Sequence, residues 1–198
     1  ITVPLASRVD ALDVVELDRD LAAALARRTD LGERLRIHNA DALRFDFRTL
    51  CAGQDGQKLR LTGNLPYNIS TPLLFHLAGQ VECIVDMHFM LQREVVLRMA
   101  ASAGQRHYGR LSIMLAQHCS VEPLFDIEPS AFKPPPKVHS SFVRLLPLSA
   151  PPFPIHDQAV FASTVAQAFS MRRKTLRNSL RSLLEAADIE SLGIDPGA

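Results

Sequence analysis

The sequence has few of the residues that build disulfide frameworks or metal centres. Its 198 residues include three cysteines, Cys51, Cys83 and Cys119, which lie far apart and form no Cys-x-x-Cys pair. The seven histidines form no His-x-x-x-His pair and no ligand pattern with a cysteine. The usual sequence signatures of a zinc site are therefore absent, and we expect reduced thiols and no metal.

The sequence also lacks an apolar run long enough to cross a membrane, and no signal peptide is evident. Its composition, 47% hydrophobic and 22% charged, is that of a folded domain with a sizeable core and a smaller appendage. We expect a cytoplasmic protein that has no contact with a membrane.

The net charge of the chain is small, but basic residues are concentrated in one segment. The net charge of +1 excludes a uniformly basic nucleic-acid binder. Residues 171–181 nevertheless contain five basic residues and no acid, which leaves 17 basic and 21 acidic residues elsewhere. An all-positive segment favours contacts with RNA phosphates, although charged helix faces are usually solvated surface. The candidate RNA-binding residues are Arg172, Arg173, Lys174, Arg177 and Arg181.

The segment Asn64-Leu65-Pro66-Tyr67 has the residue types that a flat, hydrogen-bonding substrate such as a nucleobase requires. A base amine is a poor nucleophile because its lone pair is delocalised into the ring, and two acceptors on its hydrogens would localise that pair. Asn64 can supply one acceptor and the Leu65 or Pro66 carbonyl the other. Tyr67 can stack on the base, a contact worth roughly 1–3 kcal/mol. The alternative is a simple strand-ending turn, because Asn and Pro commonly form turns.

Two acidic residues stand at corresponding positions upstream. Glu16 and Asp41 are 25 residues apart, and Asp41 and Asn64 are 23 apart; each interval fits one strand, one helix and two short loops. All three are therefore expected at the carboxyl edge of a parallel sheet, where open α/β sheets bind ligands. Glu16 suits ribose hydroxyls and Asp41 an adenine amine. The alternative for either acid is a helix cap.

Hydrophobic patterns and turn signals predict the remaining elements. A buried strand at 9–16 is followed by a helix with Leu21 and Leu25 turned inward. The last two strands are expected to form an antiparallel edge pair, and the last helix to carry leucines on one face and arginines on another. The predicted strands are 9–16, 35–38, 58–63, 81–91, 119–127 and 140–146, and the predicted helices are 19–28, 71–78, 92–100, 110–117, 157–169 and 172–187.

Five segments in order resemble the ribosomal RNA adenine dimethyltransferases, with the bacterial small-subunit enzymes as the nearest branch. The resemblance extends over nearly the whole chain. Any one of the segments is weak or moderate evidence, but five in the right order are strong. They are VELDRD at 15–20, NADA at 39–42, NLPYNIS at 64–70, FKPPPKV at 132–138 and RRKTLRN at 172–178.

The resemblance implies S-adenosylmethionine as the methyl donor and no metal. Glu16 would bind its ribose and Asp41 its adenine amine, with Leu17 and Ala42 beside them in the cofactor site. Asn64 would bind both the cofactor and the target.

The implied reaction is two successive methyl transfers to the exocyclic nitrogen of each of two adjacent adenosines in a small-subunit rRNA hairpin. The partner would be the immature 30S subunit, the role ribosome biogenesis, and the protein a monomer. Asn64, Leu65, Pro66 and Tyr67 would form the catalytic segment, and Tyr67 and Phe132 would face the flipped base. The alternative for Phe132 is a plug at the edge of the core.

The resemblance also implies an α/β architecture. Residues 1–147 would form a Rossmann-like methyltransferase domain, a mostly parallel sheet with an antiparallel edge. Residues 148–154 would be a linker, and residues 155–198 an incomplete helical domain. The family's Gly-rich loop after its first strand has no counterpart, because the sequence opens at Ile1 in what resembles the following helix. We therefore expect a chain truncated at both ends that binds S-adenosylmethionine weakly, since those glycines let the backbone approach the cofactor.

Three other functions fit parts of the pattern. A large-subunit rRNA adenine methylase of the macrolide-resistance type shares most of these motifs. A DNA or protein-glutamine amino methyltransferase more typically has two prolines where this chain has Leu65-Pro66. A non-catalytic ribosome-assembly factor would use the RNA-binding residues alone.

Overall fold

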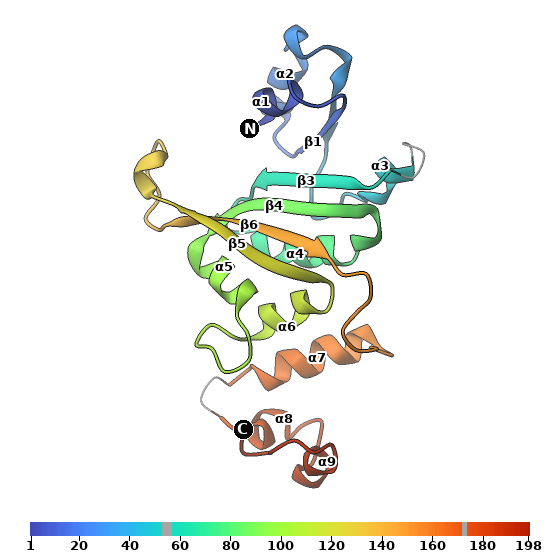
Figure 1. Cartoon of the computed structure of the whole chain (residues 1–198), viewed down its shortest axis with the longest axis vertical. Coiled ribbons are helices and arrows are strands. Elements are labelled where there is room, and N and C mark those ends of the chain that lie inside the picture. The colour runs from blue at the N-terminus through green and yellow to red at the C-terminus, as the bar shows by residue number, and fades with distance from the viewer. Residues whose placement is uncertain (53–56, 172–173) are drawn as a thin grey trace. The chain divides into compact units, whose positions relative to one another are not determined.

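The protein is an α/β structure of two compact units. It is described by a computed structural model that covers residues 1–52, 57–171 and 174–198 (Figure 1). The first unit is Ile1–Leu91 and the second is Gln92–Ala198.

Two parallel strand pairs form the frame of the first unit. β1 (Leu12–Glu16) pairs with β2 (Leu35–Asn39), and β3 (Leu59–Asn64) pairs with β4 (Ile84–Gln92). Parallel partners need a crossover connection, and helices supply most of it here. The helices are α1 (Thr2–Ala6), α2 (Arg19–Ala26), α3 (Arg48–Ala52) and α4 (Ser70–Ala78), with 3₁₀ turns at Thr29–Arg34 and Val81–Cys83. The predicted parallel strands are therefore confirmed, with the third strand one residue further along than expected.

The apolar core of this unit lies around β4 and α4. Met87 and Leu91 of β4 and Leu74 and Leu77 of α4 are almost completely buried. β1 differs, because each of its five residues is only half-buried. The prediction of a buried strand at 9–16 was therefore wrong in its start, and the burial of the strand is only partial.

The prediction that Leu21 and Leu25 of α2 point inward was wrong for Leu21, whereas Leu25 is half-buried. Leu21 is 55% exposed, and Ala22 is the residue that α2 buries. The helix contacts both β1 and β2.

The second unit contains an antiparallel strand pair with helices. β5 (Cys119–Ile127) and β6 (Ser140–Pro147) are paired antiparallel, which confirms the predicted edge pair. α5 (Arg93–Ala100) and α6 (Arg110–Ala116) pack on this pair and bury Val143 and Leu145. The remaining elements are a 3₁₀ turn at Pro129–Ala131 and the helices α7 (Gln158–Ala168), α8 (Leu176–Leu180) and α9 (Ala186–Ser191).

The helix predicted over 172–187 was wrong. Residues 172 and 173 lie outside the described part of the chain, and α8 ends at Leu180. A second helix start interrupts the leucine pattern, since the Glu185 N–H donates to Asp188 Oδ2 at 2.9 Å and begins α9. The leucines therefore do not share one face: Leu180 is buried, whereas Leu183 is half exposed. The linker at 148–154 has no helix or strand, and the domain boundary placed there stays a prediction.

The three cysteines differ in their exposure, and this predicts their reactivity. Cys83 and Cys119 are buried and Cys51 is half-buried. Burial raises the pKa of the Cys83 thiol, and it raises the pKa of Cys119 to about 12. Because the thiolate is the reactive form, both thiols stay neutral at pH 8. We expect Ellman's reagent to titrate Cys51 first in the native protein and the other two only on unfolding. Equal native rates for all three would contradict this assignment.

Candidate active site

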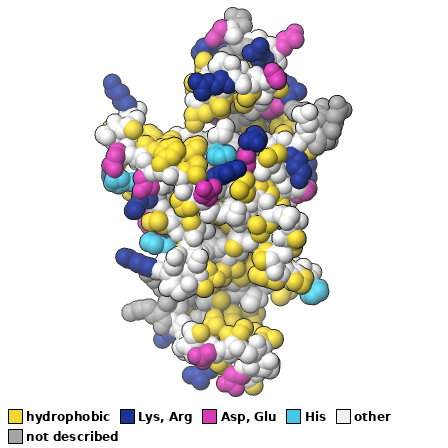
Figure 2. Space-filling model, in the orientation of Figure 1, with side chains coloured by type: hydrophobic (Ala, Val, Ile, Leu, Met, Phe, Trp, Pro, Cys, Tyr) yellow, Lys and Arg dark blue, Asp and Glu magenta, His cyan; other side chains and the backbone are white. Residues whose placement is uncertain are grey.

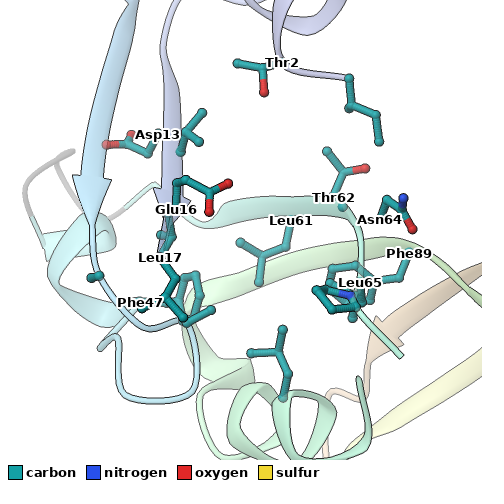
Figure 3. Close-up of a pocket in the computed structure, with 18 of the residues that line it drawn as sticks. Thr2, Asp13, Glu16, Leu17, Phe47, Leu61, Thr62, Asn64, Leu65 and Phe89 are labelled. Atoms are coloured by element: carbon teal, nitrogen blue, oxygen red, sulfur yellow. The ribbon is translucent and has the colours of Figure 1, made fainter. Parts of the chain in front are cut away.

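A pocket of about 790 Å³ lies between β1 and β3 in the first unit. Its lining includes seven of the eight residues that the sequence predicted for catalysis and cofactor binding. The eighth, Tyr67, is not in the lining. Figure 3 shows Glu16 and Asn64 on opposite sides of this pocket. The seven are Glu16, Leu17, Asp41, Ala42, Asn64, Leu65 and Pro66.

Glu16 is the last residue of β1, and its carboxylate is directed toward the pocket (Figure 3). Its Oε1 accepts a hydrogen bond from the Asp18 N–H at 2.9 Å. Asp18, and not Glu16, caps α2, because its side chain accepts from Asp20 N–H and Leu21 N–H. The helix-cap alternative for Glu16 is therefore wrong, and Glu16 Oε2 has no hydrogen bond to any described residue.

Asp41 lies in the turn after β2, which is the element paired with β1. Asn39 anchors this turn, since its side-chain amide donates to the carbonyls of Glu16 at 2.8 Å and Leu17 at 3.2 Å. Asp41 Oδ1 accepts from the Leu43 N–H at 2.9 Å, in a turn and not at the start of a helix. The two carboxylates are thus held at neighbouring strand ends by backbone contacts.

Charge pairing differs between the two ends of the pocket. At the amino end, Asp13 is held by Arg36 and His38, each at 2.7 Å. At the carboxyl end, Glu16 has no ion pair among the described residues, and Asp41 has only the exposed Arg44 at 4.0 Å. Exposed pairs of that length are weak. The carboxyl edge therefore presents two acids that can accept hydrogen bonds from a ligand.

Asn64 ends β3 and stands next to a well-anchored residue. Leu65 is buried, and its N–H donates to the Met90 carbonyl at 3.2 Å, which extends the β3–β4 ladder by one step. A turn follows, in which the Ile69 N–H donates to the Pro66 carbonyl at 3.1 Å. The Asn64 carboxamide is exposed and makes no hydrogen bond to a described residue. The segment is therefore a strand-ending turn that also presents an amide to the pocket.

The two aromatic residues predicted to stack on the base lie in different units. Tyr67 is 41% exposed and sits in the turn before α4, where its carbonyl accepts from the Ser70 hydroxyl at 3.1 Å. Phe132 is half-buried and follows the 3₁₀ turn at Pro129–Ala131. Their roles on either side of a base stay predictions.

The predicted RNA-binding residues are only partly described. Arg172 and Arg173 lie outside the described residues. Lys174, Arg177 and Arg181 are exposed, and none of them forms an ion pair within the described part of the chain. In Figure 2, the basic side chains that face the viewer stand among acidic, hydrophobic and other side chains.

Several pocket residues were not anticipated from the sequence. Thr2 and Leu5 of α1, together with Phe47 and Phe89, also line the pocket. The sequence predicted a strand at 81–91, but not that Phe89, which is 3% exposed, borders this pocket. Phe47 lies in a loop, held by a hydrogen bond from its N–H to Gln80 Oε1 at 2.8 Å. No local signal predicts a contact of this kind between residues far apart in the sequence.

The described residues contain neither a membrane-spanning helix nor a metal-binding cluster of side chains. None of the helices in the described ranges is long and apolar enough to span a membrane. Within the same ranges, no cluster of three or more His, Cys, Asp or Glu side chains could hold a metal ion.

The sequence is similar to known proteins over its whole length. The family profile described as ribosomal RNA adenine dimethylase matches residues 1–197. Ribosomal RNA small subunit methyltransferase A of Nitrosococcus oceani is 54% identical over 196 residues, 99% of this chain and 74% of that protein. The protein of the same name from Pseudomonas aeruginosa is 54% identical over 185 residues, which cover 93% of this chain and 68% of the relative.

Two solved structures are also similar to this chain. A dimethyladenosine transferase from Plasmodium falciparum has a TM-score of 0.70 at 26% identity, over 96% of this chain and 66% of that one. The 23S rRNA methyltransferase ErmE also gives a TM-score of 0.70, at 22% identity over 100% of this chain and 78% of that one, which shows the shared fold alone. The Rossmann-like methyltransferase fold and the family expected from the sequence are both confirmed. The chain belongs to the ribosomal RNA adenine dimethylase family.

Proposed function

We propose that this protein transfers methyl groups from S-adenosylmethionine to the exocyclic amines of two adjacent adenosines in small-subunit rRNA. The observation that carries the proposal is the convergence of Glu16, Asp41 and Asn64, from three successive βα segments, on one pocket. Relatives named for the small subunit are 50–56% identical to this chain. This level of identity favours the small subunit over the large-subunit alternative.

The pocket suits a nucleoside cofactor in size and in hydrogen-bonding groups. Its volume of about 790 Å³ lies within the usual range for small-molecule sites. Glu16 Oε2 is available for the ribose hydroxyls, and Asp41 for the adenine amine. Leu17 and Ala42 supply apolar contact beside them. The cofactor contributes the electrophilic methyl group, carried on its sulfonium.

The protein's own residues orient the target amine. Asn64 Oδ1 accepts a hydrogen bond from one amine hydrogen, and a backbone carbonyl accepts one from the other. We assign that carbonyl to Leu65, because the Pro66 carbonyl already accepts from the Ile69 N–H. These two bonds localise the nitrogen lone pair and direct it at the methyl carbon. Positioning of this kind is a large part of enzymatic rate enhancement.

No strong general base is required for this reaction. The amine becomes acidic once it is methylated, and its proton passes to the backbone acceptor or to water. Tyr67 and Phe132 hold the flipped base by stacking, each contact being worth roughly 1–3 kcal/mol. The pocket then has only to hold donor and acceptor in line.

The basic segment would position the rRNA. Lys174, Arg177 and Arg181 are exposed and can contact phosphates, which fix the register of RNA without reading its sequence. Arg172 and Arg173 extend the same segment. The partner is the immature 30S subunit, and we propose that the protein acts on it as a monomer in the cytoplasm.

Replacing Asn64 by alanine tests the catalytic role. Asn64→Ala removes one acceptor from the amine, and we expect methyl transfer by the whole protein to fall by about 100-fold or more. The measurement is tritiated methyl incorporation into immature small subunits, with dimethyladenosine identified by nucleoside mass spectrometry. Gln158→Ala, which removes an exposed amide from the second unit, is the control.

Both variants should unfold at the wild-type urea concentration, since each changes an exposed side chain. Full activity in Asn64→Ala would remove Asn64 from the catalytic role. Rescue of subunit assembly by a wild-type protein that transfers no methyl group would support the non-catalytic alternative.

Replacing Glu16 by glutamine tests the cofactor site separately. Glu16→Gln keeps an acceptor for the Asp18 N–H but removes the charge that strengthens hydrogen bonds to the ribose. We expect S-adenosylhomocysteine to bind about tenfold more weakly, measured by isothermal titration calorimetry. Glu33→Gln, an exposed acid away from the pocket, should leave binding unchanged. If both variants bound S-adenosylhomocysteine equally well, Glu16 would not be the residue that binds the ribose.

A further inference from the structure

The loop between β2 and α3 carries one side of the proposed cofactor site. It covers residues 40–47 and includes Asp41. Its first half is a turn, in which the Asp41 side chain accepts a hydrogen bond from the Leu43 N–H at 2.9 Å. The start of the loop is fixed to β1, because the Ala40 N–H donates to the Glu16 carbonyl at 3.1 Å. The position of Asp41 therefore depends also on what holds the other end of the loop.

A side chain far away in the sequence holds that other end. The Phe47 N–H donates to Gln80 Oε1 at 2.8 Å. Gln80 follows α4 closely and is only 3% exposed, and Phe47 is 8% exposed. Because a backbone N–H can only donate, the oxygen of the Gln80 amide faces the loop. The contact is therefore a buried hydrogen bond with a settled direction.

The ring of His76, on α4, supports the same end of the loop. His76 Nε2 lies 2.7 Å from the Phe45 carbonyl oxygen and 3.0 Å from Gln80 Nε2. The Phe47 ring contacts two other rings, with centroid distances of 5.1 Å to Phe45 and 6.3 Å to His76. Aromatic pairs at these distances attract each other. Polar and aromatic contacts thus join residues 45–47 to α4.

A buried amide such as that of Gln80 is costly unless it makes hydrogen bonds. An apolar side chain of similar size could fill this place, but it would leave the Phe47 N–H without its acceptor. The helix before Gln80 is also the one that begins at Ser70, after the turn that follows Asn64. The amide therefore links the loop of Asp41 to the element that follows the proposed catalytic segment.

We propose that Gln80 is a positioning residue of the cofactor site. It lies outside the pocket lining and acts through the loop: its carboxamide fixes residues 45–47 against α4 and so sets the place of the Asp41 carboxylate. The group that this carboxylate would recognise is the adenine amine of the cofactor, so the inference rests on the proposed function. Cofactor affinity then depends on a side chain that does not touch the cofactor.

Replacing Gln80 by methionine tests the proposal. Gln80→Met keeps an unbranched side chain but removes the acceptor for the Phe47 N–H. We expect S-adenosylhomocysteine to bind about tenfold more weakly, measured by isothermal titration calorimetry. Gln80→Glu keeps an acceptor for this N–H and should bind within about threefold of the unmodified chain. The control is Gln117→Met, at an amide of the second unit that is also 3% exposed; it should change the affinity less than about twofold.

Hydrogen exchange follows the loop directly. In the unmodified chain the Phe47 amide should exchange at least about 100-fold more slowly than an unstructured amide, although it lies in a turn. S-adenosylhomocysteine should slow it further, because binding at Asp41 stabilises the loop. Gln80→Met should speed exchange at Phe47 by about tenfold or more, whereas Gln117→Met should not.

A double-mutant cycle separates positioning from general stabilisation of the fold. Asp41→Asn alone should weaken binding of S-adenosylhomocysteine. Adding Gln80→Met to it should weaken binding by less than about threefold more, because the carboxylate that Gln80 positions is already gone. If the two losses simply multiplied, Gln80 would not act through Asp41, and the proposal would be overturned.

Three other results would also overturn the proposal. They are unchanged affinity in Gln80→Met, a tenfold loss in Gln80→Glu, and a Phe47 amide in the unmodified chain that exchanges as fast as an unstructured one. If Gln80→Met does not fold, the last two measurements still decide. Failure of the proposed function looks different, because the unmodified chain would then bind no S-adenosylhomocysteine, whereas Gln80 would still control exchange at Phe47.

Discussion

The parallel direction of the strand pairs is the constraint on which the site depends. In β1–β2 and β3–β4, parallel pairing sends the carboxyl ends of both partners to the same edge. Glu16 and Asn64 end their strands there, and Asp41 follows in the turn after β2. An antiparallel arrangement of the same sequence would separate these residues by the length of a strand. The direction of the strands therefore determines where these three residues meet.

Backbone hydrogen bonds then fix the polar groups at that edge. The Leu65 N–H to the Met90 carbonyl, and the Asn39 amide to the carbonyls of Glu16 and Leu17, hold the ends of two strands in place. Charged side chains hold the opposite end, where Asp86 is almost completely buried and meets Arg60 at 2.9 Å. A buried carboxylate needs such a partner. The acids at the carboxyl ends of the strands, Glu16 and Asp41, can therefore accept hydrogen bonds from a ligand.

The sequence predicted the parts of the structure that local patterns determine. Strand positions, the antiparallel β5–β6 pair and the meeting of Glu16, Asp41 and Asn64 follow from apolar runs and regular spacing. The break between α8 and α9 was missed, because the leucine pattern continues through it while the start at Glu185 depends on one local hydrogen bond. The sequence also did not predict that Thr2 and Phe47 line the pocket, since this arises from tertiary packing that no local pattern encodes. Burial at β1 was overestimated for a related reason: apolar residue types indicate what a strand can bury, not what covers it.

Glu16 and Asp18 have different structural roles, and this difference is useful in protein engineering. Asp18 caps the amino terminus of α2, and Glu16, two residues earlier, faces the pocket. The start of the helix thus depends on the Asp18 side chain, whereas the Glu16 carboxylate faces the pocket and holds the Asp18 backbone with one of its two oxygens. A library randomised at position 16 can explore altered sugar groups in synthetic cofactor analogues without sacrificing the helix, provided that the aspartate at position 18 is left untouched.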